Sequence, residues 1–313
     1  MKPLWLIGIV LVLTGCRHKE LWMGGEHFAT IEVAFDWDGV RTRASEEEAL
    51  SMSLYLYPES GSAPLYYELS GHAGGRIRVP FGRYAAVAWN HKNDAILMRG
   101  RGSAETLEAY TREQPLLYSM GLTTRAPRPE SIDDERSVLE PGPFWTGSAQ
   151  DLEVSMEAPL RWTIPVEDAY HRFFVEVRNV ENIEFVSEVS FAISSVCASF
   201  FPFTRELGRE DVTIPFGGRV VDGAYLEGSC TLFGHCPEQE HPHWLTIYAI
   251  LADGSKYYAH VDVTGQVHGD VPTPGTIDVE VDGISFPNPF EGDPLAFAQV
   301  DDWLTERIDL IMH

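Results

Sequence analysis

The chain has 313 residues, which is enough for two domains of ~150 residues each. Hydrophobic residues make up 44% of it and charged residues 22%, a balance that is typical of a globular protein and excludes a disordered chain. The 47 acidic residues outnumber the 23 basic ones and give a formal net charge of −24. Such a surface repels phosphate backbones, which argues against nucleic acid as a partner.

The start of the chain has the order of a secretory signal peptide. Met1-Lys2 is a short basic start, and residues 4–13 form an almost wholly apolar run. A run of about 10 apolar residues is too short to span a bilayer but suits the core of a signal peptide. It is followed by Leu13-Thr14-Gly15-Cys16, which resembles the bacterial lipobox. We predict a lipoprotein signal peptide over residues 1–15; the alternative is an ordinary secretory peptide with an incidental cysteine.

Cys16 is the predicted lipid attachment site. Acyl chains such as palmitate on this residue would hold the mature chain in the membrane, because each buried CH₂ contributes about 0.8 kcal/mol. No other segment approaches the roughly 18 uncharged apolar residues of a membrane-spanning helix. Arg17, and not aspartate, follows the cysteine, which favours the outer membrane, on its periplasmic or its cell-surface face. We expect residues 16–26 to form a tether.

Short alternating segments predict β-strands along the rest of the chain. Gly, Pro, Asp and Asn separate them, and Asp253-Gly254 predicts a tight hairpin. The candidate strands are 28–37, 51–57, 65–69, 76–79, 84–89, 151–157, 160–164, 170–177, 186–194, 212–214, 224–233, 244–252, 255–263 and 276–281. Since no helical pattern lies between them, we predict an all-β protein of two antiparallel β-sandwich domains.

Composition predicts where the two domains divide. Residues 121–150 are polar and rich in helix and strand breakers, with Pro141-Gly142-Pro143 near their end. We predict an N-terminal sandwich over residues 27–120, a connector over 121–150 and a C-terminal sandwich over 151–288. In the tail, residues 289–313, apolar side chains at helical spacing predict a short amphipathic helix.

Three stretches of the sequence resemble a known family. They are residues 15–21 with 31–37, residues 78–84 with 89–90, and residues 251–258 with 261–267. Together they resemble a Bacteroidales lipoprotein family, a domain of unknown function, that is allied to the fimbrillins and to fimbrillin-associated anchor subunits. The resemblance covers roughly residues 16–281. It implies two β-sandwiches of transthyretin-like topology and association with fimbrial or other envelope proteins, and it brings no catalytic residue.

Within that resemblance, the first strand separates two kinds of protein. In stalk subunits an arginine-specific protease removes the anchored strand, and a strand of the next subunit fills the groove. Arg41 and Arg43 follow the strand 28–37, so a cut there is conceivable. The cut would separate Cys16 and its lipid from the rest, and the tail has the wrong spacing for a donor strand. We therefore predict an anchor-like chain that keeps its first strand.

Sulfur and imidazole groups gather in one stretch of the second half. Cys230, His235, Cys236, His241 and His243 are residue types that bind zinc, but their spacing matches no common zinc motif. We favour a loop cluster without metal and expect no cofactor.

The cysteine count limits the disulfides. Three cysteines remain beside Cys16, an odd number that permits one internal disulfide at most. Whether Cys230 and Cys236 pair is left open, and Cys197 is expected to be a small buried strand residue.

The sequence contains no motif of a catalytic site that we recognise. It has no Gly-x-Ser-x-Gly elbow, no phosphate loop and no His-Glu-x-x-His. We predict a protein that is not an enzyme and favour a lipid-anchored, fimbrillin-like accessory or anchor subunit. The first alternative is a surface glycan-binding lipoprotein of a nutrient-uptake system, since Tyr55, Tyr57, Tyr66 and Tyr67 could stack on sugars. The second is an envelope hydrolase, whose triad only the fold would assemble.

Overall fold

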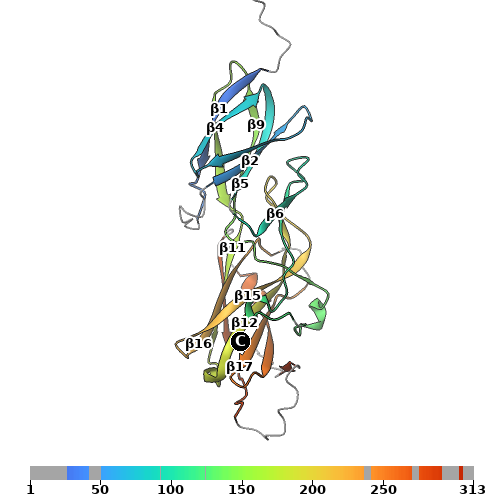
Figure 1. Cartoon of the computed structure of the whole chain (residues 1–313), viewed down its shortest axis with the longest axis vertical. Helices are drawn as coiled ribbons and strands as arrows, with labels where there is room; N and C mark the ends of the chain where they lie inside the picture. The colour runs from blue at the N-terminus through green and yellow to red at the C-terminus, as the bar shows by residue number, and fades with distance from the viewer. Residues whose placement is uncertain are drawn as a thin grey trace, which may run out of the picture.

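The computed structural model describes residues 27–41, 51–91, 93–123, 125–235, 241–269, 275–290 and 303–305. As the alternating pattern predicted, the protein is all-β, with two sandwiches stacked end to end and a small sheet between them (Figure 1). Helical structure in the described residues is limited to short turns. These are η1 (Tyr118–Met120), η2 (Glu130–Ile132), η3 (Ile183–Phe185) and α1 (Thr264–Val267).

The upper sandwich in Figure 1 is a seven-stranded sheet that folds on itself. Its hydrogen-bonded order is β3 (Leu65–Ser70), β2 (Ser51–Pro58), β5 (Gly82–Asn90), β9 (Trp145–Val154), β10 (Arg161–Asp168), β1 (Phe28–Asp36) and β4 (Gly74–Pro80). β10 belongs to both layers, because residues 161–165 pair in parallel with β1 and residues 166–168 pair antiparallel with β9. Every second residue of β10 is buried, as the sequence alternation requires.

The lower sandwich is built in the same way from a nine-stranded sheet. Its order is β19 (Thr276–Asp282), β11 (His171–Arg178), β16 (Tyr225–Leu232), β15 (Asp211–Val221), β12 (Val186–Cys197), β17 (Trp244–Leu251), β18 (Lys256–Asp262) and β20 (Leu304–Thr305), and β8 (Arg136–Ser137) pairs with β15. Here β15 changes partner, from β12 to β16, at Gly217-Gly218. The predicted hairpin joins β17 to β18, with Gly254 at φ 85°.

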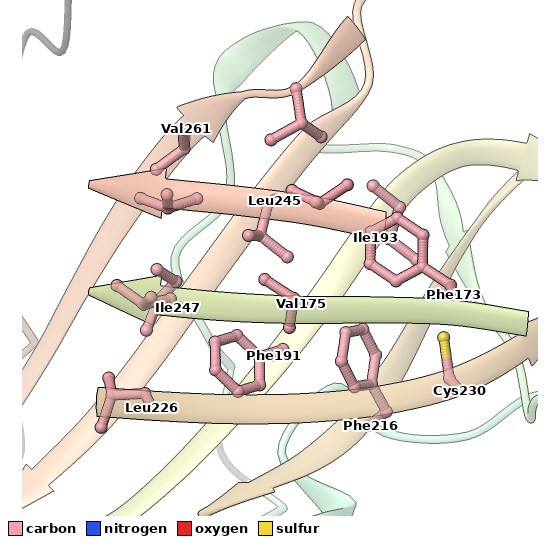
Figure 2. Close-up of a cluster of buried hydrophobic side chains, with 14 of the residues drawn as sticks. Phe173, Val175, Phe191, Ile193, Phe216, Leu226, Cys230, Leu245, Ile247 and Val261 are labelled. Carbon is pink, nitrogen blue, oxygen red and sulfur yellow. The ribbon is translucent and has the colours of Figure 1, made fainter. Parts of the chain in front are cut away.

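The core of the lower sandwich contains a close approach between a ring and two glycines. Gly218 and Gly228 face each other across β15 and β16. A Cβ atom on either would lie 2.3 or 2.7 Å from a ring carbon of Phe191. Figure 2 shows this ring among Val175, Ile247 and Leu226. The glycines therefore provide the space in which Phe191 is fully buried.

A four-stranded sheet lies between the two sandwiches and takes strands from both halves of the chain. Its order is β14 (Glu206–Leu207), β13 (Ser199–Phe201), β7 (Glu108–Thr111) and β6 (Ile96–Arg99). β13 follows β12 of the lower sandwich, whereas β6 and β7 follow β5 of the upper one. The two halves thus share a hydrogen-bonded sheet.

The strand pairing differs from the expected domain division. β9 and β10, which we assigned from residue 151 to the C-terminal sandwich, pair with β5 and β1 of the first. Order along the chain does not fix strand partners, and here the chain returns to its first sheet after an excursion. We now propose that residues 27–90 with 145–168 form the first sandwich and that the second begins at His171.

The breaker-rich stretch expected to be a connector packs on the lower sandwich. β8 pairs in parallel with β15, and Ile132 is buried. The Glu135 carboxylate accepts hydrogen bonds from Ser195 N at 2.9 Å and Thr213 Oγ1 at 2.8 Å. Burial raises the pKa of Glu135, and these two bonds oppose the rise. The part of the stretch around Ile132 to Ser137 therefore belongs to the second sandwich's surface, whereas residues 145–150 lie in β9 of the first.

The tail differs from the predicted helix where the structure describes it. Leu304–Thr305 forms strand β20, which pairs in parallel with β18. The Trp303 ring packs edge-on against Tyr248, with ring centroids 5.3 Å apart. The remainder of the predicted helix lies outside the described residues.

Candidate functional site

The first strand is built into its sheet with a partner on each side. β1 pairs antiparallel with β4 and in parallel with β10. Ile31, Val33 and Phe35 point into the core and are 0%, 1% and 7% exposed. Loss of β1 would remove three core side chains and two ladders of backbone hydrogen bonds together.

The chain after β1 is fixed at two points. Trp37 Nε1 donates to the His72 carbonyl oxygen at 2.8 Å, and its ring meets Trp145 edge-on. The backbone N–H of Arg41 donates to Asp168 Oδ2 at 2.7 Å. Arg41 is exposed, and Arg43 lies outside the described residues. The structure thus places Arg41, one of the two candidate cleavage sites, directly beside the junction of the sandwiches.

Asp168 is the central polar residue of that junction. It ends β10, only Ala169 and Tyr170 separate it from β11, and it is 1% exposed. Trp145 Nε1 donates to its Oδ1 at 3.0 Å, and Arg205 donates to its backbone carbonyl at 2.8 Å. The buried carboxylate fixes the N–H groups of Trp145 and Arg41 that donate to it, because leaving any of these groups unpaired costs free energy.

Aromatic packing joins the two halves at the same place. Phe144 precedes β9, whereas Phe200 on β13 and Phe233 after β16 come from the second half. Their ring centroids lie 6.1 to 6.4 Å apart, and all three are buried within the core of the first sandwich. The core of the first sandwich therefore includes side chains from the second half of the chain, which resists bending at the junction.

The returning segment before β9 is bonded to both halves. Asn90 Oδ1 accepts from Trp145 N at 2.9 Å, and its Nδ2 donates to the Pro143 carbonyl at 3.0 Å. On the other side, Glu140 Oε2 accepts from Thr231 N at 2.8 Å and from Thr231 Oγ1 at 3.0 Å. The sequence predicts only a connector here, because no local pattern reveals partners 53 to 91 residues away.

The expected group of sulfur and imidazole donors is only partly assembled. His235, His243 and His268 lie together, with His243 Nε2 and His268 Nε2 at 2.9 Å and the rings of His235 and His268 stacked. His241 instead lies 3.6 Å from Asp211, and Cys236 lies outside the described residues. Within the described part of the chain, no group of three or more His, Cys, Asp or Glu is arranged to hold a metal ion.

Burial controls the protonation of these histidines. His243 is fully buried, and desolvation lowers its pKa from 6.5 to about 4. Desolvation likewise lowers the pKa of His171, at the start of β11, to about 4. Both side chains are therefore neutral at pH 7.

The cysteines divide into one bonded and one free. Cys197 is buried, as expected, and is disulfide-bonded, which was not expected. Cys230 is free and lies in the core of the lower sandwich, so the open question of its pairing is answered (Figure 2). Burial raises the pKa of its thiol, which makes this sulfur unsuited to nucleophilic chemistry.

One polar cluster has the residue types of a hydrolase triad. On the outer face of β2 and β3, Ser53 Oγ lies 2.8 Å from His91 Nδ1, and His91 Nε2 lies 3.5 Å from Glu68 Oε1. Ser53 is 1% exposed, however, and the Tyr66 hydroxyl lies 3.2 Å from its Oγ. The Ser53 hydroxyl is thus covered by Tyr66 and His91, and its hydrogen bonds join β2 to β3 and to the residue after β5.

The same face carries a stack of aromatic rings. Tyr55 lies between Tyr57, Tyr66 and Trp89, with ring centroids 5.0 to 6.0 Å apart. Tyr66 is 46% exposed, whereas Tyr57 and Trp89 are buried. Cross-strand packing therefore uses most of these rings, and Tyr66 alone of the four is offered widely to solvent.

The predicted lipid site, Cys16, and the signal peptide lie outside the described residues. In the part of the chain that the structure describes, no helix has the length and apolar character needed to span a bilayer.

Comparison with known proteins identifies the family. The model of the domain of unknown function DUF5119 matches residues 15–217, more than half of the chain. The chain belongs to the DUF5119 family. The match begins next to Cys16 and extends into β15.

Among curated proteins, the chain is similar to a candidate fimbrium anchoring subunit, Fim4B, of Bacteroides ovatus. The two are 32% identical over 106 residues, which is 34% of this chain and 30% of that protein. The alignment thus spans less than a third of the relative's length.

Two solved structures show the same fold. A candidate adhesin of Bacteroides ovatus has a TM-score of 0.59 at 20% identity and is matched over 84% of this chain and 95% of its own. A candidate polysaccharide-binding protein (DUF1812) of Bacteroides thetaiotaomicron has a TM-score of 0.52 at 12% identity, over 82% and 91%. The predicted kinship with fimbrillin-like envelope proteins of Bacteroidales is confirmed by these findings together with the family match.

Proposed function

We propose that this DUF5119 chain is a non-catalytic accessory or anchor subunit of a fimbrial type, attached to the outer membrane by a lipid on Cys16. The position of β1 carries the proposal. The segment that would bear the lipid leads directly into a strand held by two neighbours and by three core side chains. A tether attached in this way transmits force into a strand that has a partner on each side.

The junction supports the same function. A subunit that holds a fibre or an adhesive assembly must keep its two ends in a fixed relation under load. Asp168, the aromatic contacts of Phe144 and the shared four-stranded sheet join the sandwiches into one elongated body (Figure 1). The name of the Fim4B relative is in keeping with this proposal, over the third of the chain that aligns.

Lipidation and location are tested together by a cysteine substitution. The full chain and its Cys16→Ala variant are expressed in a bacterium that processes lipoproteins and labelled with a palmitate analogue. We expect the unmodified chain to carry the palmitate label and to sediment with the outer membrane. The Cys16→Ala variant should do neither. Cys230→Ala is the matched control and should retain both. A Cys16→Ala protein that still carries label in the outer membrane would overturn the lipid site.

Partnership is tested in the native envelope. Mild cross-linking and affinity purification of the full chain should recover fimbrial subunits from its own envelope. Recovery of an outer-membrane transporter with glycosidases, and no fimbrial subunit, would contradict the proposal.

Glycan binding is a second candidate, favoured by the exposure of Tyr66 within the aromatic stack. His91 and Glu68 supply hydrogen-bonding groups beside this ring. Binding to a polysaccharide array that Tyr66→Ala abolishes, and Tyr118→Ala on another surface does not, would support this function. An array without signal for the unmodified chain would exclude it for the sugars tested.

A further inference from the structure

Exposed apolar side chains gather at one end of the first sandwich. In the part of the chain that the structure describes, seven large apolar side chains are exposed, and four of them lie at this end: Phe28, Phe81, Met156 and Leu160. The others, Tyr66, Tyr118 and Phe290, are spread over the rest of the molecule. Single exposed apolar residues are common, but a group on one surface marks a contact site.

Backbone contacts bring the four residues together. The Phe81 N–H donates to the His27 carbonyl at 2.7 Å, which joins the β4–β5 turn to the start of β1. The Glu32 N–H donates to the Leu160 carbonyl at 2.8 Å, which joins β1 to the β9–β10 turn. The start of β1 and both turns thus form the upper end of the molecule in Figure 1. We call this surface the apolar end.

The apolar end is ordered by its own contacts. Ser155 Oγ accepts hydrogen bonds from the backbone N–H groups of Glu157 at 3.3 Å and Ala158 at 3.1 Å. This turn holds Met156 outward, 85% exposed. The side chains are therefore presented by a fixed framework.

Basic and acidic groups both lie around these apolar side chains. Arg76, Arg78, Arg83 and Arg161 are exposed at this end, as are Glu32 and Glu157. The Arg78 guanidinium lies 4.4 Å from the centre of the Phe28 ring. Acidic groups are also present, since Arg83 faces Glu153 at 4.0 Å. Apolar groups with arginines beside them are typical of surfaces that lie at the boundary between water and lipid.

The tether limits how far the apolar end can be from the bilayer. The eleven residues 16–26 lead to His27. Fully extended, they reach at most about 40 Å, which is short beside a stack of two sandwiches. We propose that the apolar end docks on the phospholipid surface, with Phe81, Met156 and Leu160 in the headgroup region. The proposal rests on the proposed lipid attachment and adds to it a second, non-covalent contact that orients the molecule.

The test uses the mature chain, residues 16–313, with Cys16→Ser so that no acyl chain contributes. Its flotation with vesicles of phosphatidylethanolamine and phosphatidylglycerol is compared with that of a Phe81→Ser/Leu160→Ser double variant. We expect the parent to float with vesicles and the double variant to lose about tenfold in vesicle affinity. The matched control, Tyr118→Ser/Phe290→Ser, should remain within about twofold of the parent. Since all four positions are exposed, circular dichroism should show the fold retained in both variants.

Each outcome decides a different question. A parent that does not bind vesicles, or a control that loses as much affinity as the double variant, would overturn docking. Light scattering that shows a dimer abolished by the double variant would also overturn it, because the occupant would then be a second copy of the chain. Lipidation of Cys16 is scored separately by palmitate labelling of the full chain. If the parent binds vesicles but the full chain is not lipidated, docking is supported and the lipid attachment is refuted. If the full chain is lipidated but the parent does not bind vesicles, the lipid attachment is supported and docking is refuted.

Discussion

Each sandwich contains a strand with three buried apolar side chains that pairs in parallel with a neighbour, β1 in the first and β19 in the second. The two strands lie at different positions in their sheets. In the first, β1 joins β10 and is covered on its other side by β4. In the second, β19 joins β11 and ends the sheet. Both strands bury three apolar side chains, Ile31, Val33 and Phe35 in β1, and Ile277, Val279 and Val281 in β19. A strand between two partners cannot open without breaking two ladders, whereas an edge strand opens by breaking one.

The difference between β1 and β19 matters for the proposed anchor function. The strand that follows the proposed lipid tether occupies the position with two partners. A tether joined to an edge strand could be pulled away one hydrogen bond at a time. One joined to β1 must disturb β4, β10 and the core together.

The largest expected effect is that of a charge buried under β1. Val33→Asp should lower the free energy of unfolding by about 4 kcal/mol, because an unpaired carboxylate replaces an apolar side chain in the core. Amide hydrogen exchange should then accelerate throughout the first sandwich. Val279→Asp should instead accelerate exchange mainly in β19 and its neighbour β11. Thr30→Asp, on the exposed face of β1, is the control and should change little. If faster amide exchange extended equally far through the sheet in Val33→Asp and Val279→Asp, the proposed difference between β1 and β19 would be contradicted.

The junction should show the next largest effect. Asp168→Ala removes the acceptors of Trp145 Nε1 and Arg41 N, and should cost about 3 kcal/mol, measured by urea unfolding. We also expect the single transition of the parent to separate into two as the sandwiches uncouple. Glu167→Ala removes only an exposed partner of Arg205 and should stay within about 1 kcal/mol. If Asp168→Ala still unfolds in a single transition, the aromatic contacts around Phe144 are enough to couple the two sandwiches without the Asp168 carboxylate.

Sequence patterns predicted most of the long strands, missed short ones such as 96–99 and 108–111, and did not predict strand partners. The strand expected at 160–164 is present and longer, as β10 (Arg161–Asp168), and the Asp253-Gly254 turn joins β17 to β18 as expected. The assignment of β9 and β10 to the first sheet depends on contacts with residues far along the chain. No local feature of Asp168 distinguishes it from the many solvated acids of this sequence. The packing of Phe200 and Phe233 around Phe144 had no sequence signal for the same reason.

The two bends provide a finer comparison. Each sandwich has a strand that changes layers beside a glycine without room for a Cβ atom. At Gly147 that atom would lie 2.5 Å from the Pro165 carbonyl oxygen, a backbone group, whereas at Gly228 it would meet the Phe191 ring at 2.7 Å. A ring can shift more readily than a sheet backbone. Gly147→Ala should therefore lower the free energy of unfolding by about 3 kcal/mol, and Gly228→Ala should lower it by about 2 kcal/mol. Thermal unfolding measures both changes. The opposite order would show that the lower core is the more rigid of the two.

Acid should act on the lower sandwich through its buried histidines. The pKa of His243 is about 4 in the folded chain and 6.5 when exposed, so the unfolded state takes up the proton first as pH falls. Stability is thus constant above about pH 6.5 and declines below it, with a loss of about 2 kcal/mol at pH 5 from this residue. His243→Gln should lose correspondingly less between pH 7 and pH 5. His241→Gln, at an exposed position, should follow the parent. If the free energy of unfolding depended on pH in the same way for the parent and for His243→Gln, the acid-induced loss could not be attributed to His243.

The central claim is that the chain keeps β1 and the residues before it, with the lipid on Cys16. Intact mass and N-terminal sequencing of the protein from its native envelope test this directly. The account predicts an acylated chain that begins at Cys16. A lipid-free chain that begins at Thr42 or Ala44, after cleavage at Arg41 or Arg43, would contradict it and indicate a subunit that gives up its first strand.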